Sequence, residues 1–130
     1  MLENNHEKKP KKYAGILAHP TSFPSPYGIG DLGKGAYRFI DFLANSGLNL
    51  WQVLPLGHTG FGDSPYQPFS AFAGQPLIID LDALKEYKLL SEDDFTDMPE
   101  WDPIHIDYGT LITFKTKLLK LAYERFTDPD

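Results

Sequence analysis

Two short apolar runs on either side of an amphipathic segment constrain the fold of this chain more than any other feature. Residues 13–18 (YAGILA) end at His19-Pro20, and residues 48–56 (LNLWQVLPL) are almost continuously apolar. Runs of this length and composition are typical of buried strands, and the proline ends the first run because it cannot donate to a sheet ladder. The pattern predicts two strands joined by a helix, which indicates an α/β fold.

The connecting helix is predicted from apolar residues that share one face at helical spacing, namely Leu32, Ala36, Phe39, Ile40 and Leu43. We expect Asp31 to cap its N-terminus and Gly47 to end it. The strands of such a unit are parallel and the crossover is right-handed, so both following loops emerge at one edge of the sheet. This edge binds ligands in open α/β sheets and in (β/α)8 barrels.

The sequence pattern of the C-terminal half predicts short elements followed by one long helix. We expect a short strand over residues 77–81, then a brief helix over residues 83–88 with an aspartate at 80 or 82 as its cap. Residues 91–94 (SEDD) have the pattern of a capping box for a further short helix. The last helix is predicted over residues 109–126, where one face gathers the apolar side chains Leu111, Phe114, Leu118, Leu121 and Ala122.

Charge separates a basic leader from an acidic body. Residues 1–12 contain four lysines and no apolar periodicity, so we expect a mobile leader there and the folded part in residues 13–130. The whole chain has 12 Lys and Arg against 18 Asp and Glu, a net charge of −6, which argues against nucleic acid and anionic membranes as partners. No run approaches the roughly 18 apolar residues of a membrane span. We therefore expect neutral polar partners, no nucleic acid and no membrane.

The chain has no cysteine, which removes disulfides, thiolate zinc sites and cysteine nucleophiles, and favours a cytoplasmic location. Its histidines are scattered, at positions 6, 19, 58 and 105, and none forms a helical pair that suits a metal. The sequence also lacks both common glycine-rich phosphate loops. We expect no metal and no cofactor.

The long loop over residues 57–76 (GHTGFGDSPYQPFSAFAGQP) has the composition of a carbohydrate-binding segment. Sugars offer C–H faces to aromatic rings, which suits Phe61 and Tyr66, and paired hydroxyls to polar groups, which suits Asp63, Ser64 and Gln67. The alternative is that the rings only fill the mouth of a hydrophobic core beneath the loop. We interpret His19, beside the first strand end, as a hydrogen-bonded supporting residue and not as a catalytic base.

A complete glycosyl-transfer site is not evident in the sequence. That chemistry needs two carboxylates facing each other across the bond, and Asp63 is the single acid of the long loop. Asp31 is the expected helix cap, and Asp80 and Asp82 follow another element. We therefore expect no catalytic residue in this chain.

Several long motifs in a fixed order resemble one family. GILAHPTSFPSPYGIGDLG, AYRFIDFLANSG, WQVLPLG, TGFGDSPYQPFSAFAGQPLIIDLDAL and DYGTLITFKTKLLKLAYERF together cover residues 14–126. In these motifs the chain resembles the N-terminal part of the 4-alpha-glucanotransferases (amylomaltase or disproportionating enzyme, glycoside hydrolase family 77). The resemblance implies the first portion of a (β/α)8 barrel, with one βαβ unit, an inserted loop and helices. Residues 13–130 would then be incomplete as a domain, since such a barrel needs about 250 residues.

The resemblance also implies a function in starch and glycogen metabolism. The family transfers α-1,4-glucan segments between maltodextrins by a retaining double displacement through a glucosyl-enzyme, without a dissociable cofactor. Its carboxylates come from later barrel strands, so none is carried over here, and this chain alone is expected to be inactive. Its partners would be maltooligosaccharides or α-glucan and the remainder of the barrel.

Within the chain, the resemblance assigns substrate contact to residues 63–67, with Tyr66 as the foremost sugar contact beside Asp63, Ser64 and Gln67. Phe61 replaces a tyrosine that the family associates with a second glucan site, and it keeps the ring while losing the hydroxyl. Two alternatives stay open: a stand-alone maltodextrin-binding module, and a truncated non-catalytic fragment.

Overall fold

The computed structural model describes residues 12–58 and 73–128. Strands β1 (Gly15–Leu17) and β2 (Leu50–Gln52) pair in parallel, with Ile16 opposite Trp51. The predicted parallel pair is confirmed, although each strand is shorter than the apolar run that contains it. The ladder continues for one residue beyond β1, where the Ala18 amide donates to the Gln52 carbonyl at 3.0 Å.

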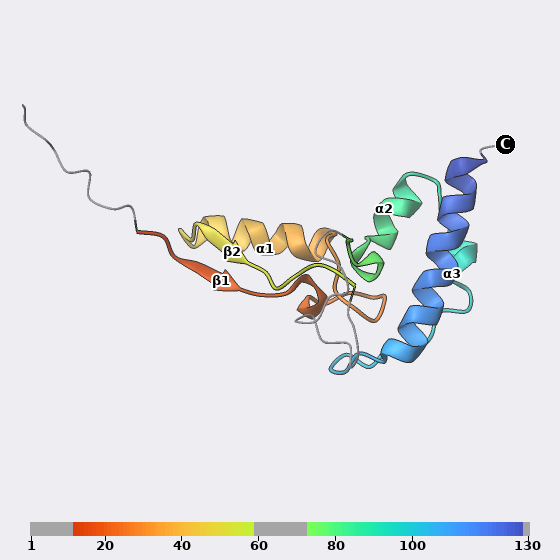
Figure 1. The fold of residues 1–130 in the computed structure, drawn as a ribbon, viewed down its shortest axis with the longest axis horizontal. Coiled ribbons are helices and arrows are strands. Elements are labelled where there is room, and N and C mark those ends of the chain that lie inside the picture. Colours follow the sequence, from red (N-terminus) through yellow and green to blue (C-terminus); the bar gives the residue numbers. More distant parts are fainter. Residues whose placement is uncertain (1–11, 59–72, 129–130) are drawn as a thin grey trace, which may run out of the picture.

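Helix α1 (Lys34–Asn45) joins the strands and lies along one face of the pair (Figure 1). The Phe39 ring lies 5.3 Å from the Trp51 ring on β2 and 5.0 Å from Phe23 in the loop after β1. The helix ends before Gly47, whose φ of +70° suits glycine and confirms the predicted stop. These three aromatic side chains hold the strand–helix–strand unit together.

The predicted cap of α1 is wrong in position. Gly33 is the N-cap residue, and its carbonyl accepts the Tyr37 amide at 3.1 Å. The Asp31 carboxylate accepts the Gly33 amide at 2.9 Å, so its side chain closes the turn that precedes the helix. Leu32, predicted on the apolar stripe, therefore lies before the helix and is 45% exposed.

The second half contains α2 (Leu81–Glu86) and α3 (Tyr108–Thr127), with short 3-10 helices η3 (Pro76–Ile78) and η4 (Glu92–Phe95). A further 3-10 turn, η1 (Pro20–Ser22), follows β1. Asp80 caps α2, as one of the two predicted alternatives, and Asp107 caps α3. The predicted capping box at Ser91 is present and begins η4. The last helix is thus confirmed to within one residue at each end.

The predicted strand over residues 77–81 is wrong, because η3 and the start of α2 occupy this segment. Pro76 supplies no amide hydrogen and fixes φ near −65°, which suits the first turn of a helix. The Leu77 and Ile79 carbonyls are bound by a lysine of α3, so they need no neighbouring strand.

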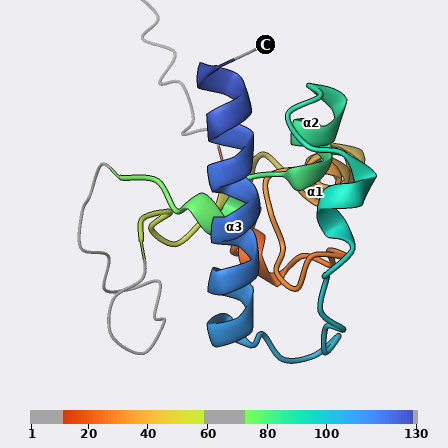
Figure 2. The ribbon, with the colours of Figure 1, turned by 90° about the vertical axis from the view of Figure 1, so that its right-hand side faces the viewer.

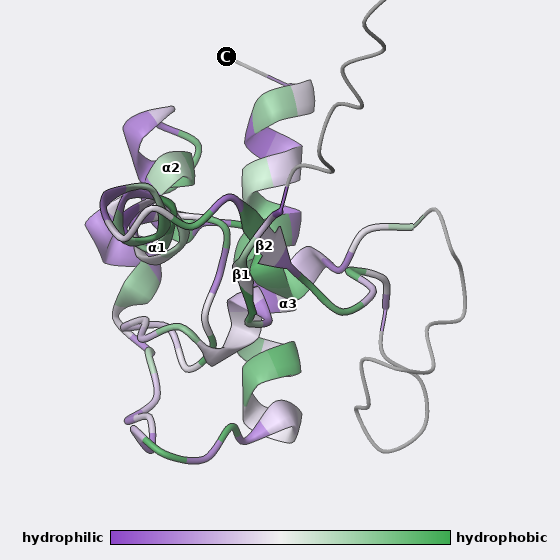
Figure 3. Ribbon diagram, turned by 90° about the vertical axis from the view of Figure 1, so that its left-hand side faces the viewer, coloured by the Kyte–Doolittle hydropathy of each residue, from purple (hydrophilic) through white to green (hydrophobic). Residues whose placement is uncertain are grey.

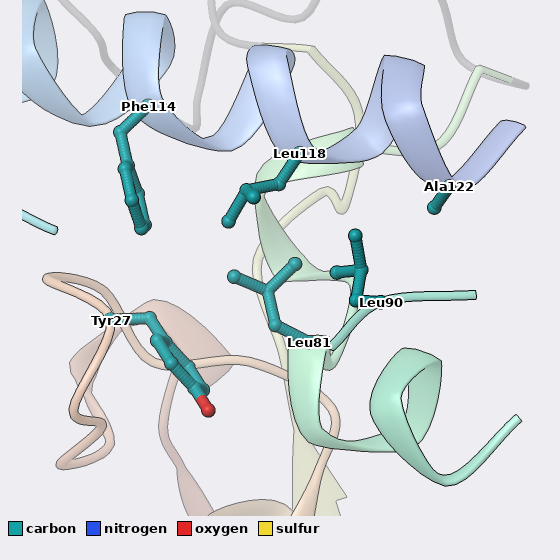
Figure 4. Close-up of a cluster of buried hydrophobic side chains, with 6 residues drawn as sticks. All are labelled: Tyr27, Leu81, Leu90, Phe114, Leu118 and Ala122. Carbon is teal, nitrogen blue, oxygen red and sulfur yellow. The ribbon is translucent and has the colours of Figure 1, made fainter. Parts of the chain in front are cut away.

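The hydrophobic core lies between the loop after β1, α2 and α3, at one end of the strand pair (Figures 1 and 2). Its larger cluster, drawn in Figure 4, consists of Tyr27, Leu81, Leu90, Phe114, Leu118 and Ala122. A smaller cluster joins Ile29, Leu77 and Leu111. All four of the buried α3 residues in these clusters belong to the predicted stripe of that helix.

Residues 12–58 and 73–128 leave the face of the strand pair opposite α1 uncovered. Leu17 on β1 is 55% exposed and Leu50 on β2 is 51% exposed. Figure 3 shows the hydropathy of the strand pair, with α1 to one side of it. The apolar run over residues 48–56 predicted cover on both faces, but the described residues supply it on one face only. No helix in the described part of the chain is long and apolar enough to cross a membrane.

One ion pair ties the end of α3 to η4 and gives a testable expectation. Asp94 accepts from both Arg125 terminal nitrogens, at 2.7 and 3.0 Å, and this guanidinium holds the pKa of the carboxyl well below its ordinary value. Replacing Asp94 with Asn is expected to lower the free energy of unfolding by about 1 kcal/mol, since a bidentate charged pair is lost. The pair's contribution to stability should also begin to fall once the pH drops below 3.8, where the unfolded carboxyl takes up a proton, and should be fully lost only below the much lower pKa of the folded carboxyl.

Asp97 provides the matched control. It pairs with Lys117 through one contact of 3.2 Å, and both side chains are mostly exposed. The Asp97→Asn change is expected to cost less than about 0.5 kcal/mol. Urea unfolding of both variants, followed by circular dichroism at pH 7 and pH 3, compares them. Equal losses at pH 7 would contradict the special contribution of the Asp94 pair.

Candidate functional site

The carboxyl ends of β1 and β2 lie at one edge of the sheet because the strands are parallel. The Trp51 indole Nε1 donates to the Ala18 carbonyl at 2.8 Å, which fixes the end of β1 against β2. The loop over residues 18–33 and the loop over residues 53–75 therefore begin side by side. This edge is the candidate functional site, as the strand–helix–strand pattern predicted.

The loop after β2 is closed at its base by backbone contacts. Gly57 and Gly74 form an antiparallel bridge, and the Gln75 amide donates to the Leu56 carbonyl at 2.8 Å. We call these four residues the loop root. The segment that the root encloses therefore starts and finishes at one point of the carboxyl edge.

All five residues predicted to contact sugar belong to this loop: Phe61, Asp63, Ser64, Tyr66 and Gln67. They lie outside the described residues, so their roles stay predictions. What the structure contributes is the position of the loop root at the carboxyl edge. The loop therefore originates where ligands bind in folds with parallel strands.

His19 caps the turn at the end of β1. Its Nδ1 accepts from the Thr21 hydroxyl at 2.7 Å and from the Thr21 amide at 3.4 Å. With Nδ1 accepting, the ring hydrogen of the neutral histidine sits on Nε2, which is buried and has no partner among the described residues. This geometry agrees with a hydrogen-bonded supporting role for His19.

A groove of about 700 Å³ lies between residues 21–30 and residues 98–106. Trp101 forms part of its wall, with its ring 5.5 Å from Phe114 and its Nε1 buried without a partner among the described residues. Prolines from both segments also line the groove, at positions 24, 26, 99 and 103. No motif in the sequence indicates this groove, because its two walls are far apart along the chain.

The described residues contain no group of three or more histidines and acids arranged to hold a metal ion. The acids at the site have other partners: Asp31 binds the Gly33 amide and Asp80 binds the Asp82 amide. Burial raises the pKa of Asp31. Asp31 and Asp80 lie close enough to interact with each other, and both also interact with the charge of Lys115, so the structure gives them a scaffold role.

A parallel strand–helix–strand unit with a loop root at its carboxyl edge defines an α/β protein, a class in which ligands commonly bind at that edge. The family model for 4-alpha-glucanotransferases matches residues 18–130. The chain therefore belongs to the 4-alpha-glucanotransferase family, glycoside hydrolase family 77, as its motifs indicated.

Individual relatives agree with the family match. The chain is 48% identical over 116 residues to a 4-alpha-glucanotransferase of Synechocystis, a match that covers 89% of this chain and 23% of the relative. It is 50% identical over 113 residues to a 4-alpha-glucanotransferase of Clostridium butyricum, a match that covers 86% of this chain and 23% of the relative. Among solved structures, it resembles an amylomaltase from Streptococcus agalactiae in complex with acarbose, with a TM-score of 0.84 and 42% identity over 90% of this chain.

The chain spans about a quarter of the length of these relatives, since it covers 24% of the Streptococcus agalactiae chain and 23% of the Synechocystis relative. The shared portion has the mixed α/β architecture with the parallel β1–β2 pair. The described fold therefore resembles part of an amylomaltase in both structure and sequence, with a TM-score of 0.84 and 42% identity.

Proposed function

We propose that this chain forms the N-terminal part of a 4-alpha-glucanotransferase that transfers α-1,4-glucan segments between maltodextrins in the cytoplasm. The observation that carries the proposal is the family match over residues 18–130, which begins directly after β1 and extends through β2 and helices α1, α2 and α3. Starch and glycogen breakdown products are the substrates that this activity uses. No cofactor takes part in the proposed reaction.

We propose further that the strand pair is the start of a (β/α)8 barrel. Among the described residues, each strand of the sheet has one partner, so each has one free edge. Free edges and the exposed apolar side chains of Leu17 and Leu50 are unfavourable in water, and a closed barrel removes both. The remainder of the barrel, which in the relatives is about three-quarters of the chain, is the proposed partner of this face.

The proposed reaction is a retaining double displacement, in which a carboxylate attacks the anomeric carbon and an acceptor sugar hydroxyl then replaces it. This chain supplies no catalytic residue to that proposal. Its contribution is the loop over residues 57–76, where Tyr66, Ser64, Asp63 and Gln67 hold the glucan and Phe61 serves a second glucan site. The closed loop root at the carboxyl edge supports this role.

Replacing Tyr66 with Ala tests the proposed sugar contact. We define the hybrid enzyme as residues 1–130 of this chain joined to the part of the Synechocystis relative that follows the matched segment. In the hybrid enzyme, Tyr66→Ala is expected to raise KM for maltotriose about tenfold, because both the ring face and the hydroxyl are lost. Initial rates of glucose release over a range of maltotriose concentrations measure the effect.

Tyr87→Ala is the matched control, because Tyr87 ends α2 and is 76% exposed. It is expected to leave KM within about twofold of the unsubstituted hybrid. If Tyr66→Ala behaves like Tyr87→Ala, the loop does not hold the glucan. Heat of maltoheptaose binding by residues 1–130 alone, lost in Tyr66→Ala, would instead favour a stand-alone binding module.

A further inference from the structure

Lys115 is a completely buried lysine in the middle of α3. Its ammonium nitrogen donates to the Leu77 carbonyl at 2.7 Å and to the Ile79 carbonyl at 3.0 Å. Lysine is rarely buried unless its charge is satisfied, because moving an ammonium group out of water is costly. The two carbonyls therefore satisfy the hydrogen-bonding needs of the ammonium group. Helix α3 packs against η3, the turn that carries the Leu77 carbonyl.

The charge of Lys115 is balanced by two acids on other elements. Asp31, before α1, and Asp80, the cap of α2, both favour its charged form, while burial lowers its pKa to about 8. Each of these carboxylates also accepts a backbone amide, at 2.9 Å in both cases. The lysine thus sits between the loop after β1, the start of α2 and the turn of η3.

The segment that Lys115 binds is the return arm of the loop at the candidate site. Gln75, the last residue of the loop root, directly precedes η3, and its carbonyl accepts the Ile78 amide at 3.2 Å. The Ile78 carbonyl accepts the Leu32 amide at 3.0 Å. Consecutive carbonyls from Leu77 to Ile79 are therefore all bound, two by Lys115 and one by the loop after β1.

We infer that Lys115 is a positioning residue for glucan binding, because it fixes the return arm of the substrate loop through the Leu77 and Ile79 carbonyls. This inference rests on the proposed function of the loop. Without the ammonium group, the buried Leu77 carbonyl and the partly buried Ile79 carbonyl lose their donor, and the turn after the loop root can relax toward other partners. The loop root would then be held less firmly at the carboxyl edge, which is expected to weaken glucan binding by the proposed loop.

A Lys115→Met change in the hybrid enzyme tests the inference, because methionine keeps the unbranched apolar stem and removes the donor. We expect KM for maltotriose to rise about tenfold while kcat changes less than about threefold. A purely structural role would instead reduce the amount of folded enzyme and leave KM of the remainder unchanged. Unchanged KM in folded Lys115→Met enzyme overturns the inference.

Two further variants complete the comparison. Lys117→Met changes an exposed lysine two residues away on the same helix, and it is expected to leave KM and kcat within about twofold. Lys115→Arg keeps the charge and the donors in a bulkier group, and it is expected to raise KM about threefold. If Lys115→Met does not fold, the Arg variant decides: a raised KM supports the inference and an unchanged KM overturns it.

Amide hydrogen exchange separates this inference from the proposed function. In Lys115→Met, the amides of Gln75 and Ile78 are expected to exchange at least about tenfold faster, while the Leu48 amide, bound to Leu43 at the end of α1, is unchanged. If Tyr66→Ala leaves KM unchanged, the proposed function of the loop fails. Faster exchange at Gln75 and Ile78 would then still support positioning by Lys115, and unchanged exchange there would overturn it.

Discussion

Residues 1–130 incubated alone with maltotriose are expected to leave it unchanged, whereas the hybrid enzyme is expected to convert it to glucose and longer maltodextrins. The neighbouring carboxylates Asp31 and Asp80 are held by backbone amides and by the charge of Lys115, whereas the double displacement requires one carboxylate free to attack the sugar and a second that donates a proton. Enzymes of this kind accelerate their reactions by on the order of a millionfold or more, so the contrast should be all or none. Thin-layer or anion-exchange chromatography of the products measures it.

The control for the hybrid enzyme is its Synechocystis part alone. That part is expected to be inactive, because a barrel that lacks its first strand–helix–strand unit has no partner for its own edge strands. Chain-length redistribution by residues 1–130 alone would contradict the absence of a catalytic pair. Full activity of the Synechocystis part alone would contradict the scaffold role of this chain.

The Gly30→Ala change is expected to lower the free energy of unfolding by about 3 kcal/mol or more. Gly30 lies in the loop after β1, and its amide donates to the Thr21 carbonyl at 3.1 Å. A methyl group there would lie 2.2 Å from the Pro20 carbonyl oxygen and 2.6 Å from the Phe23 carbonyl oxygen. Both contacts are with backbone, which cannot turn aside as a side chain can. The urea concentration at the midpoint of unfolding should therefore be much lower for the Gly30→Ala variant than for the unsubstituted protein.

Gly74→Ala is the matched control, because a methyl group at Gly74 would meet no atom of the described residues within 4 Å. Its effect on the free energy of unfolding is expected to stay within about 0.5 kcal/mol. Both variants remove a glycine from a loop at the carboxyl edge, so any general effect of reduced backbone freedom is shared. Similar midpoints for the two variants would show that the tight packing around Gly30 is not what stabilises this loop.

The elements that the sequence predicted correctly are those with strong local signals. The α3 helix has a sustained apolar stripe and a capping aspartate, and it forms as predicted. The two strands and α1 were also predictable, because their apolar runs and glycine stop specify the strand–helix–strand order. Local signals do not depend on which elements pack together in the folded chain, so predictions based on them agree with the structure.

The errors arise where a distant residue decides the local conformation. The apolar segment after Gln75 resembles a strand, but Lys115, far along the chain, binds its carbonyls and stabilises a 3-10 turn. Asp31 looked like a helix cap, but its side chain closes the turn before the helix. Lys115 itself gave no signal, because a lysine within a helix is normally assigned to the exposed face.

The candidate site was only partly predictable for the same reason. The parallel strands and the long loop indicated the carboxyl edge, and the Gly57–Gly74 bridge places the loop root there. The family resemblance, which the comparisons bear out, named the residues of the loop, and composition alone left sugar binding and core filling open. Neither source indicated Lys115 or the groove beside Trp101, since both depend on contacts between separate segments.

A crystal structure of the hybrid enzyme with acarbose is the most direct test of the central claim, that this chain supplies the first barrel strands and the glucan-holding loop. We predict that both free edges of the β1–β2 pair are hydrogen-bonded to strands of the Synechocystis part. We also predict that Tyr66 contacts a sugar ring. Free strand edges, or acarbose bound at the carboxyl edge of the barrel without any contact from residues 57–76, would contradict the claim.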